Sequence, residues 1–409
     1  MMSKKKIGLA LSGGGYRAAA FHIGTLKKLN ELGVLREVNI LSAISGGAIT
    51  GAAYCLHNSD FKSFETSMIN ILSTKNVIKF VLTSWRFLKI AIPALFLLTA
   101  AFVLPFTRYG SYSILPLLLL IFAIIKYQFR LLPVSKIIES AYDNFFFKGA
   151  TLNQLCDTPE IAIGSTNLQT QRHFTFSKRK MEDSTYAYYK PPIYFKGDNF
   201  PVARAVMASS CVPFAFTPVD IDKCYFGDQS MTQKVNPKLV DGGVYDNQGL
   251  HKLTYDGSSY SCEIVIVSDA GNNLPFDKLY NNTFTLLLRT VDTFMARIKN
   301  FQMMQNIYQK PNKREIAYLS LGWGVEGCLS GFVSNLQSGT ISTEIIAFHK
   351  LSDQWVNSPL AHQNEIIQHL IKSQNLQVIL DQKLSDDRVE KIRKVGTNLT
   401  CLKRTTIDD

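Results

Sequence analysis

Apolar residues alternate between short runs and helical repeats in the N-terminal part of the chain. Residues 6–12 form a short apolar run that ends at a glycine, which is typical of a buried strand. Residues 17–32 place apolar side chains at helical spacing, and Gly33 follows as a candidate C-cap. Residues 38–45 repeat the strand pattern, and residues 46–56 read as a helix rich in small residues. Strand, helix, strand and helix in this order predict a parallel α/β sheet.

Two uncharged apolar segments interrupt this alternation, at residues 90–106 and 110–125, with Arg108 between them. As helices they would be about 24–26 Å long, near the lower limit for crossing a hydrocarbon core of about 30 Å. We expect a membrane-embedded helical hairpin, and three prolines within it leave a re-entrant hairpin open. The alternative is an apolar lid buried in a soluble protein.

Basic residues flank the apolar pair on both sides. By the positive-inside rule they place both outer ends of the hairpin, and with them the rest of the chain, on the cytoplasmic side of the membrane. The flanking residues are Lys75, Lys79, Arg86, Lys89, Lys126, Arg130 and Lys136.

The pattern of a soluble protein resumes near residue 145. Residues 159–168 and 262–271 read as further buried strands that end in polar turns, residues 285–310 as a helix, and residues 384–404 as an amphipathic C-terminal helix. We therefore expect a discontinuous domain with one insertion. Its boundaries are residues 1–60 and 140–409 for the domain and 61–139 for the insertion.

Composition narrows the possible partners and compartments. The 409 residues carry a net charge of +12, which favours phosphate-bearing partners, either nucleic acid or an anionic membrane. Seven cysteines without a C-x-x-C pair argue against a disulfide scaffold or structural zinc and favour a reducing compartment. The apolar run after the N-terminal lysines is too short for a secretory signal, so we interpret it as a strand.

Three consecutive glycines, Gly13, Gly14 and Gly15, follow the first strand. A dinucleotide site would need an acidic residue at the end of the second strand, which is absent, and no G-K-[ST] follows for a phosphate-binding loop. Consecutive glycines can instead point peptide N–H groups at an anion. Arg17, just beyond them, is a candidate to steer a phosphate or to brace this turn, with a surface salt bridge as the alternative.

Ser45 lies at the predicted turn from the second strand into the next helix, in the stretch Ala43-Ile44-Ser45-Gly46-Gly47. This is the G-x-S-x-G pattern of a nucleophile elbow with alanine in its first position. A serine hydroxyl needs a base, and the seven histidines have no motif context. The better candidate is Asp241, where an apolar strand runs into Asp-Gly-Gly, provided that a water-poor pocket raises its basicity.

Together these blocks resemble the patatin-like phospholipase family, which is related to cytosolic phospholipase A2. The resemblance rests on three ordered motifs, namely the glycine turn with Arg17, the turn around Ser45, and Asp241 with its two glycines. Supporting similarity lies in residues 161–177 and 203–219. The resemblance covers residues 6–57 and 150–272.

The resemblance implies a three-layer α/β/α sandwich of patatin type, here with an inserted hydrophobic helical hairpin. It also implies a Ser–Asp dyad that uses no metal, histidine or cofactor. Ser45 would be the nucleophile, Asp241 the base, and the amides of Gly13, Gly14 and Gly15 the oxyanion hole. The implied reaction is hydrolysis of fatty acyl esters of membrane glycerolipids through an acyl-enzyme, of phospholipase A or lysophospholipase type.

Two alternatives stay open, an acyltransferase with the same dyad and a catalytically idle membrane scaffold. We expect no nucleic-acid partner. The chain departs from the family pattern at Ala43, which stands where glycine is usual, and in its hydrophobic insertion. The basic residues 172–180 are a candidate contact for anionic headgroups, with a solvated loop as the alternative.

Overall fold

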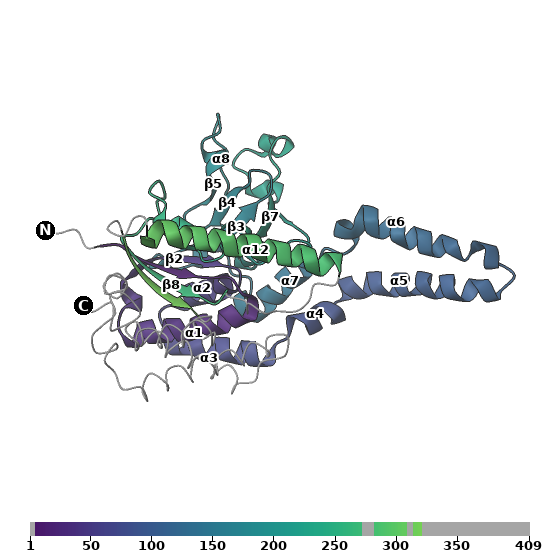
Figure 1. Ribbon diagram of the computed structural model, residues 1–409, viewed down its shortest axis with the longest axis horizontal. Helices are drawn as coiled ribbons and strands as arrows, with labels where there is room; N and C mark the ends of the chain where they lie inside the picture. Colours follow the sequence, from purple (N-terminus) through teal and green to yellow (C-terminus); the bar gives the residue numbers. More distant parts are fainter. Residues whose placement is uncertain (1–4, 272–281, 309–313, 321–409) are drawn as a thin grey trace, which may run out of the picture.

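A single mixed β-sheet organises the molecule (Figure 1). The computed structural model describes residues 5–271, 282–308 and 314–320. The strands are β1 (Ile7–Leu11), β2 (Val38–Ile44), β3 (Glu160–Asn167), β4 (Arg172–Phe176), β5 (Met181–Asp183), β6 (Val219–Asp220), β7 (Lys238–Asp241), β8 (Ile264–Asp269) and β9 (Glu315–Ser320).

The sheet has a parallel centre and an antiparallel flank. Its order is β5-β4-β3-β2-β1-β8-β9, with β7 beside β3 and β6 beside β7. Strands β1, β2, β3, β8 and β9 pair in parallel, whereas β4, β5, β6 and β7 join by antiparallel pairing. The parallel sheet predicted from the N-terminal alternation is confirmed.

Helices cover both faces of the sheet. They are α1 (Gly15–Glu31), α2 (Gly46–Leu56), α3 (Phe61–Thr74), α4 (Val77–Thr83), α5 (Trp85–Val103), α6 (Ile114–Leu131), α7 (Val134–Tyr142), α8 (Ser184–Ala187), α9 (Val202–Ser209), α10 (Gly243–Asp246), α11 (Leu250–Thr254) and α12 (Thr283–Met303). The helix and strands expected at residues 46–56, 159–168 and 262–271 correspond to α2, β3 and β8. The helix expected at residues 384–404 lies outside the described residues.

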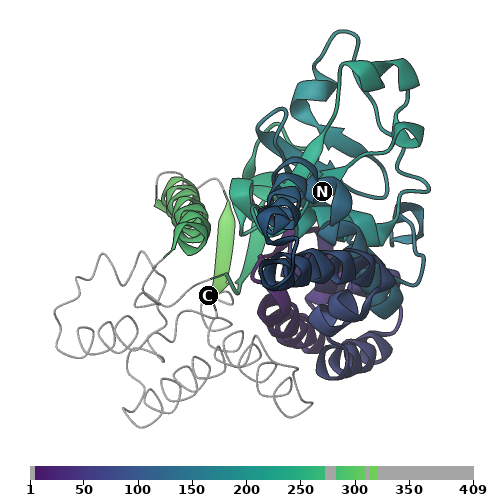
Figure 2. The same cartoon turned by 90° about the vertical axis from the view of Figure 1, so that its right-hand side faces the viewer.

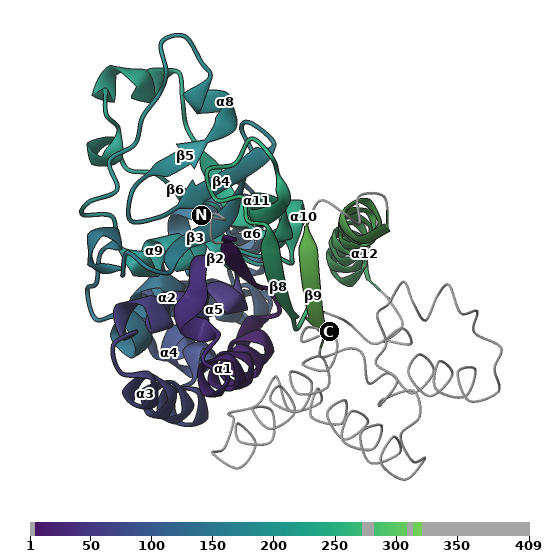
Figure 3. The same cartoon turned by 90° about the vertical axis from the view of Figure 1, so that its left-hand side faces the viewer.

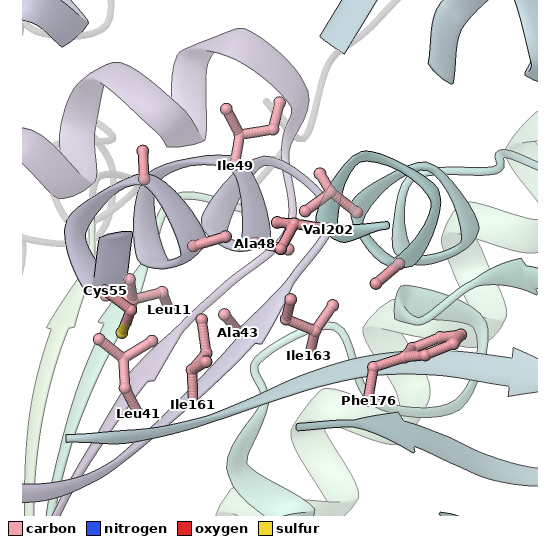
Figure 4. Close-up of a cluster of buried hydrophobic side chains, with 14 of the residues drawn as sticks. Leu11, Leu41, Ala43, Ala48, Ile49, Cys55, Ile161, Ile163, Phe176 and Val202 are labelled. Atoms are coloured by element: carbon pink, nitrogen blue, oxygen red, sulfur yellow. The ribbon is translucent and has the colours of Figure 1, made fainter. Parts of the chain in front are cut away.

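Two hydrophobic cores, one on each face of the sheet, produce the three layers. The larger core packs α1, α2, α3 and α9 against one face, and Figure 4 shows Ala48 and Val202 above Ala43, Ile161 and Ile163. The smaller core packs Leu250 and Leu253 of α11 against the other face. Because both faces are covered, β1 and β2 read as nearly continuous apolar runs. Figure 3 shows α12 beside β9 at one edge of the sheet.

The predicted apolar hairpin consists of α5 and α6, which pack against each other and project from the body (Figures 1 and 2). The helices begin and end at other residues than expected, because Ser84 caps the start of α5 through the Phe87 amide and the turn takes up residues 104–113. By length and composition, the spans Trp85–Phe106 and Gly110–Phe147 could cross a membrane, with mean hydropathies of 2.3 and 1.9.

The apolar side chains of the hairpin are not buried by the rest of the described chain. Phe102, Phe106 and Ile125 are each exposed over more than 70% of their surface. An apolar lid buried within a soluble protein is therefore not what the described residues show.

The basic segment at residues 172–180 is not a free cationic patch. Lys178 pairs with Asp157 at 2.9 Å, Arg179 with Glu160 at 3.4 Å and Lys180 with Glu182 at 2.7 Å. Three of the cations in this segment therefore have carboxylate partners, and its contact with anionic headgroups stays a prediction.

Candidate active site

Ser45 sits at the strained turn between β2 and α2. Its backbone has φ 50° and ψ −116°, a conformation that a residue with a side chain rarely adopts. Its amide donates a hydrogen bond to the Ser209 hydroxyl at 2.8 Å, and only 7% of its surface is exposed. Strain of this kind costs about 1–3 kcal/mol and concentrates at functional sites.

Small residues around Ser45 let two backbone segments approach closely. A Cβ atom on Gly46 would overlap the Gly15 carbonyl, so α2 begins in direct contact with the glycine turn. Ala43 is fully buried in β2, between Leu11 of β1 and Ile163 of β3. The alanine at this position is therefore accommodated within the sheet.

Strand β3 explains why Ser45 and Asp241 lie together. Its first half pairs in parallel with β2, and the last pair joins Ile44 to Gly164. Its second half pairs antiparallel with β7, and the last pair joins Asp241 to Ser165. Because β4 takes the other edge of β3, β2 and β7 share one edge and run toward each other. Their carboxyl ends meet opposite two consecutive residues of β3.

Burial controls the chemistry of Asp241. Asp241 is only 6% exposed, and burial raises the pKa of its carboxyl to about 6, while the nearby Gly243 amide and Ser45 hydroxyl act to lower it. The Gly243 amide donates to Oδ1 at 2.7 Å. A carboxylate with a raised pKa next to a serine hydroxyl is a stronger proton acceptor than a solvated one.

Ser209, the last residue of α9, links the two candidate residues, and sequence reasoning did not assign it a role. Its hydroxyl donates to the Gly164 carbonyl at 2.6 Å while it accepts from Ser45. Its carbonyl accepts the Gly242 amide at 3.1 Å. The residue lies in the block 203–219 that resembles the family, but only the folded geometry shows what it contacts.

The glycine turn presents two amides beside this pair. Gly14 and Gly15 have φ of 138° and 63°, which favour glycine, and both residues are exposed. Within the described residues no hydrogen bond engages either amide. The amide of Gly13, in contrast, donates to the Asn247 carbonyl at 2.8 Å. This bond removes Gly13 from the candidate oxyanion donors and corrects the sequence-based expectation.

Arg17 lies in the first turn of α1 and is half-buried, and no salt bridge engages it among the described residues. Its Nε atom is buried and has no hydrogen-bond partner within the described part of the chain. Burial lowers the pKa of the guanidinium, and the charge of Asp269 partly offsets this.

In the described parts of the chain, no hydrogen bond joins a histidine to Ser45 or Asp241. Among the described residues, no group of three or more His, Cys, Asp or Glu side chains could hold a metal ion. His22 is fully buried and contacts the Ser12 carbonyl at 2.9 Å and Ser268 at 2.8 Å, which is a structural arrangement.

Comparisons with known proteins give a fold match and a family match. No curated protein matches the chain. Human GIVD cytosolic phospholipase A2 shares its fold, with a TM-score of 0.51 at 13% identity over 99% of this chain. This chain spans 60% of that protein's length. VipD from Legionella pneumophila is matched at 11% identity over 99% of this chain and 91% of its own, with a TM-score of 0.30.

A family profile described as patatin-like phospholipase matches residues 9–253, which is more than half of the chain and includes Ser45 and Asp241. The profile thus covers the glycine turn, the strained serine turn and the strand that ends at the aspartate. The chain belongs to the patatin-like phospholipase family, a family of serine hydrolases.

Proposed function

We propose that this protein is a membrane-attached lipid acyl hydrolase in which Ser45 is the nucleophile and Asp241 the general base. The observation that carries the proposal is the meeting of β2 and β7 on one edge of β3, which puts the serine next to a buried carboxyl. The Ser45 hydroxyl lies close enough to the Asp241 carboxyl to lower its pKa, which supports the same assignment.

In the first half of the reaction, the Ser45 oxygen attacks the ester carbonyl carbon and its proton passes to the Asp241 carboxylate. The amides of Gly14 and Gly15 would stabilise the oxyanion of the tetrahedral intermediate, and each such donor typically contributes about 3–4 kcal/mol. The intermediate collapses when the C–O bond breaks, and Asp241 returns the proton to the leaving alcohol. The acyl chain remains on Ser45.

In the second half, water attacks the acyl-enzyme and gives its proton to Asp241. Collapse of the second tetrahedral intermediate releases the fatty acid, and the proton returns to Ser45. The helix α2 begins at Gly46, so its positive N-terminal end faces the serine oxygen and favours the developing alkoxide.

The hairpin supports a membrane lipid as the substrate class. Acyl chains of glycerolipids are buried in bilayers, and an enzyme anchored by α5 and α6 would meet its substrate without extracting it into water. The basic residues that flank the hairpin favour a catalytic domain on the cytoplasmic side.

Fatty-acid release from phospholipid vesicles tests this function. We expect Ser45→Ala and Asp241→Asn to abolish release while both chains stay folded. Full activity in either variant would contradict the dyad. Transfer of the chain to an added alcohol would indicate an acyltransferase, and absence of any product from the wild type would indicate an idle scaffold.

A further inference from the structure

We propose that residues 212–216, together with α4 and the base of the hairpin, form a surface that rests on an anionic lipid bilayer beside the dyad. We call these residues the interfacial loop, and Phe214 is its apolar anchor. The inference rests on the proposed function for the identity of the dyad, but the surface can be tested without activity.

The interfacial loop is fixed at both ends, between the dyad and the hairpin. At its start, the Cys211 carbonyl accepts the amide of Asp241 at 2.7 Å. At its end, the Thr217 carbonyl accepts the hydroxyl of Ser135 in α7, and the Thr217 hydroxyl contacts the carbonyl of Leu132 at 3.4 Å. Ser135 and Leu132 lie just after α6. The loop therefore bridges from the candidate base to the root of the hairpin.

Phe214 has the properties of a contact residue rather than a core residue. It is 57% exposed, and its φ of 68° is unfavourable for an aromatic side chain. A strained backbone that presents a large apolar side chain to the outside suggests a functional contact. The neighbouring Val212 is also exposed, whereas Phe216 packs against the core and anchors the loop.

The hairpin root continues the same apolar surface. Ile78, Leu82 and Trp85, in α4 and the first turn of α5, are exposed over 63%, 50% and 66% of their surfaces. Figure 1 shows the hairpin leaving the body beside α4 and α7. Figure 2 looks along the hairpin onto this end of the body. A bilayer that holds α5 and α6 would meet this end of the body first.

The charges around the hairpin root favour an anionic lipid bilayer as the partner surface. Residues 66–138 contain eight Lys and Arg residues and no Asp or Glu, and residues 205–219 contain no charged residue. An anionic headgroup layer would therefore meet cations at the hairpin root and no repulsive carboxylate on the loop. Each basic residue near such a surface adds electrostatic attraction to it. Lys89 lies over the Trp85 ring at 5.5 Å, an arrangement suited to the headgroup region.

A rate comparison on two substrates tests the surface. We compare the wild type with Phe214→Ala, using a phospholipid in vesicles of phosphatidylcholine and phosphatidylserine and a water-soluble short-chain ester. Loss of about 1–2 kcal/mol of docking should lower the ratio of the vesicle rate to the soluble-ester rate by about 5- to 30-fold. The matched control is Tyr188→Ala, because Tyr188 is 84% exposed and follows α8, away from the hairpin in Figure 1. Its ratio should stay within about twofold of the wild type.

A binding measurement separates failure of the surface from failure of the proposed function. In full-length Ser45→Ala protein reconstituted into the same vesicles, Phe214→Trp should add tryptophan emission that brominated lipids quench, and Tyr188→Trp should not. Unquenched emission from Phe214→Trp, or an unchanged rate ratio in Phe214→Ala, would overturn the proposal that the interfacial loop rests on the bilayer. Quenching without activity in the wild type would support the surface and contradict the hydrolase.

Discussion

The Ser209 hydroxyl accepts a hydrogen bond from the Ser45 amide at 2.8 Å and donates one to the Gly164 carbonyl at 2.6 Å. The bond from Ser45 gives its amide an acceptor while the residue has a φ of 50°, a strained angle that the surrounding turn must maintain. Ser209 is itself fully buried. If its hydroxyl were removed, water could not easily take its place as the acceptor of the Ser45 amide. The strained conformation of the candidate nucleophile thus depends on a side chain from α9, a helix that follows it much later in the chain.

Replacing Ser209 should reduce turnover more than substrate binding. In Ser209→Ala the Ser45 amide has no acceptor, at a cost of about 1–3 kcal/mol, so we expect kcat to fall about 5- to 150-fold with little change in KM. Steady-state kinetics on a soluble ester measure this.

The control is Ser177→Ala. Ser177 is equally buried; its hydroxyl accepts hydrogen bonds from Tyr260 at 2.9 Å and from the Lys180 amide at 3.2 Å, and donates one to the Lys180 carbonyl at 3.1 Å. It should lose comparable stability and keep its kcat. An equal loss of kcat in both variants would show that Ser209 acts only through stability.

Asp241→Asn should inactivate the protein and stabilise its fold. The carboxyl has a pKa of about 6 in the folded chain against 3.8 as its ordinary value, so its ionised form at pH 7 costs about 3 kcal/mol of folding free energy. This cost is absent below about pH 4, grows as the pH rises toward about 6, and is constant above that. We expect the melting temperature of Asp241→Asn to exceed that of the wild type by several degrees at pH 7 and to equal it near pH 4.

The activity should depend on pH through the same group. Only the ionised Asp241 can take the proton of Ser45, so kcat/KM should rise tenfold per pH unit below about pH 6 and level off above it. A pH–rate profile on a soluble ester measures this. A profile that is flat from pH 5 to pH 8 would argue against Asp241 as the base.

Gly46→Ala tests the close approach of the glycine turn to α2. The added methyl group would overlap the Gly15 carbonyl, which is backbone and cannot move aside without shifting the candidate oxyanion amides. We expect activity to fall below detection and stability to drop by about 1–3 kcal/mol. Gly197→Ala is the control, since its nearest neighbour would lie at an ordinary 3.7 Å, and it should keep full activity.

Removing the hairpin should change where the protein partitions. Because α5 and α6 pack side by side, residues 86–130 can be replaced by a short flexible linker without stretching the body. We expect the shortened chain to move from the membrane fraction to the soluble fraction and to keep activity on a soluble ester. Unchanged partitioning would argue against membrane attachment by the hairpin.

Local patterns predicted the elements that carry the chemistry, but not how distant segments support them. The runs before Gly13 and Ser45 predicted two parallel strands, since apolar strands and glycine turns are local features. The antiparallel placement of β7 depends on its register with β3, which the sequence does not encode locally. Likewise, the carbonyl of Asn247 engages the Gly13 amide from a distant part of the chain, so the three glycines looked equivalent in sequence.

Covalent labelling by a fluorophosphonate, followed by peptide mapping, tests the central assignment most directly. The Ser45–Asp241 pair predicts a single adduct on the Ser45 oxygen in the wild type, no adduct in Ser45→Ala, and labelling slowed by about 100-fold or more in Asp241→Asn. An adduct on another residue, or an undiminished labelling rate in Asp241→Asn, would contradict it.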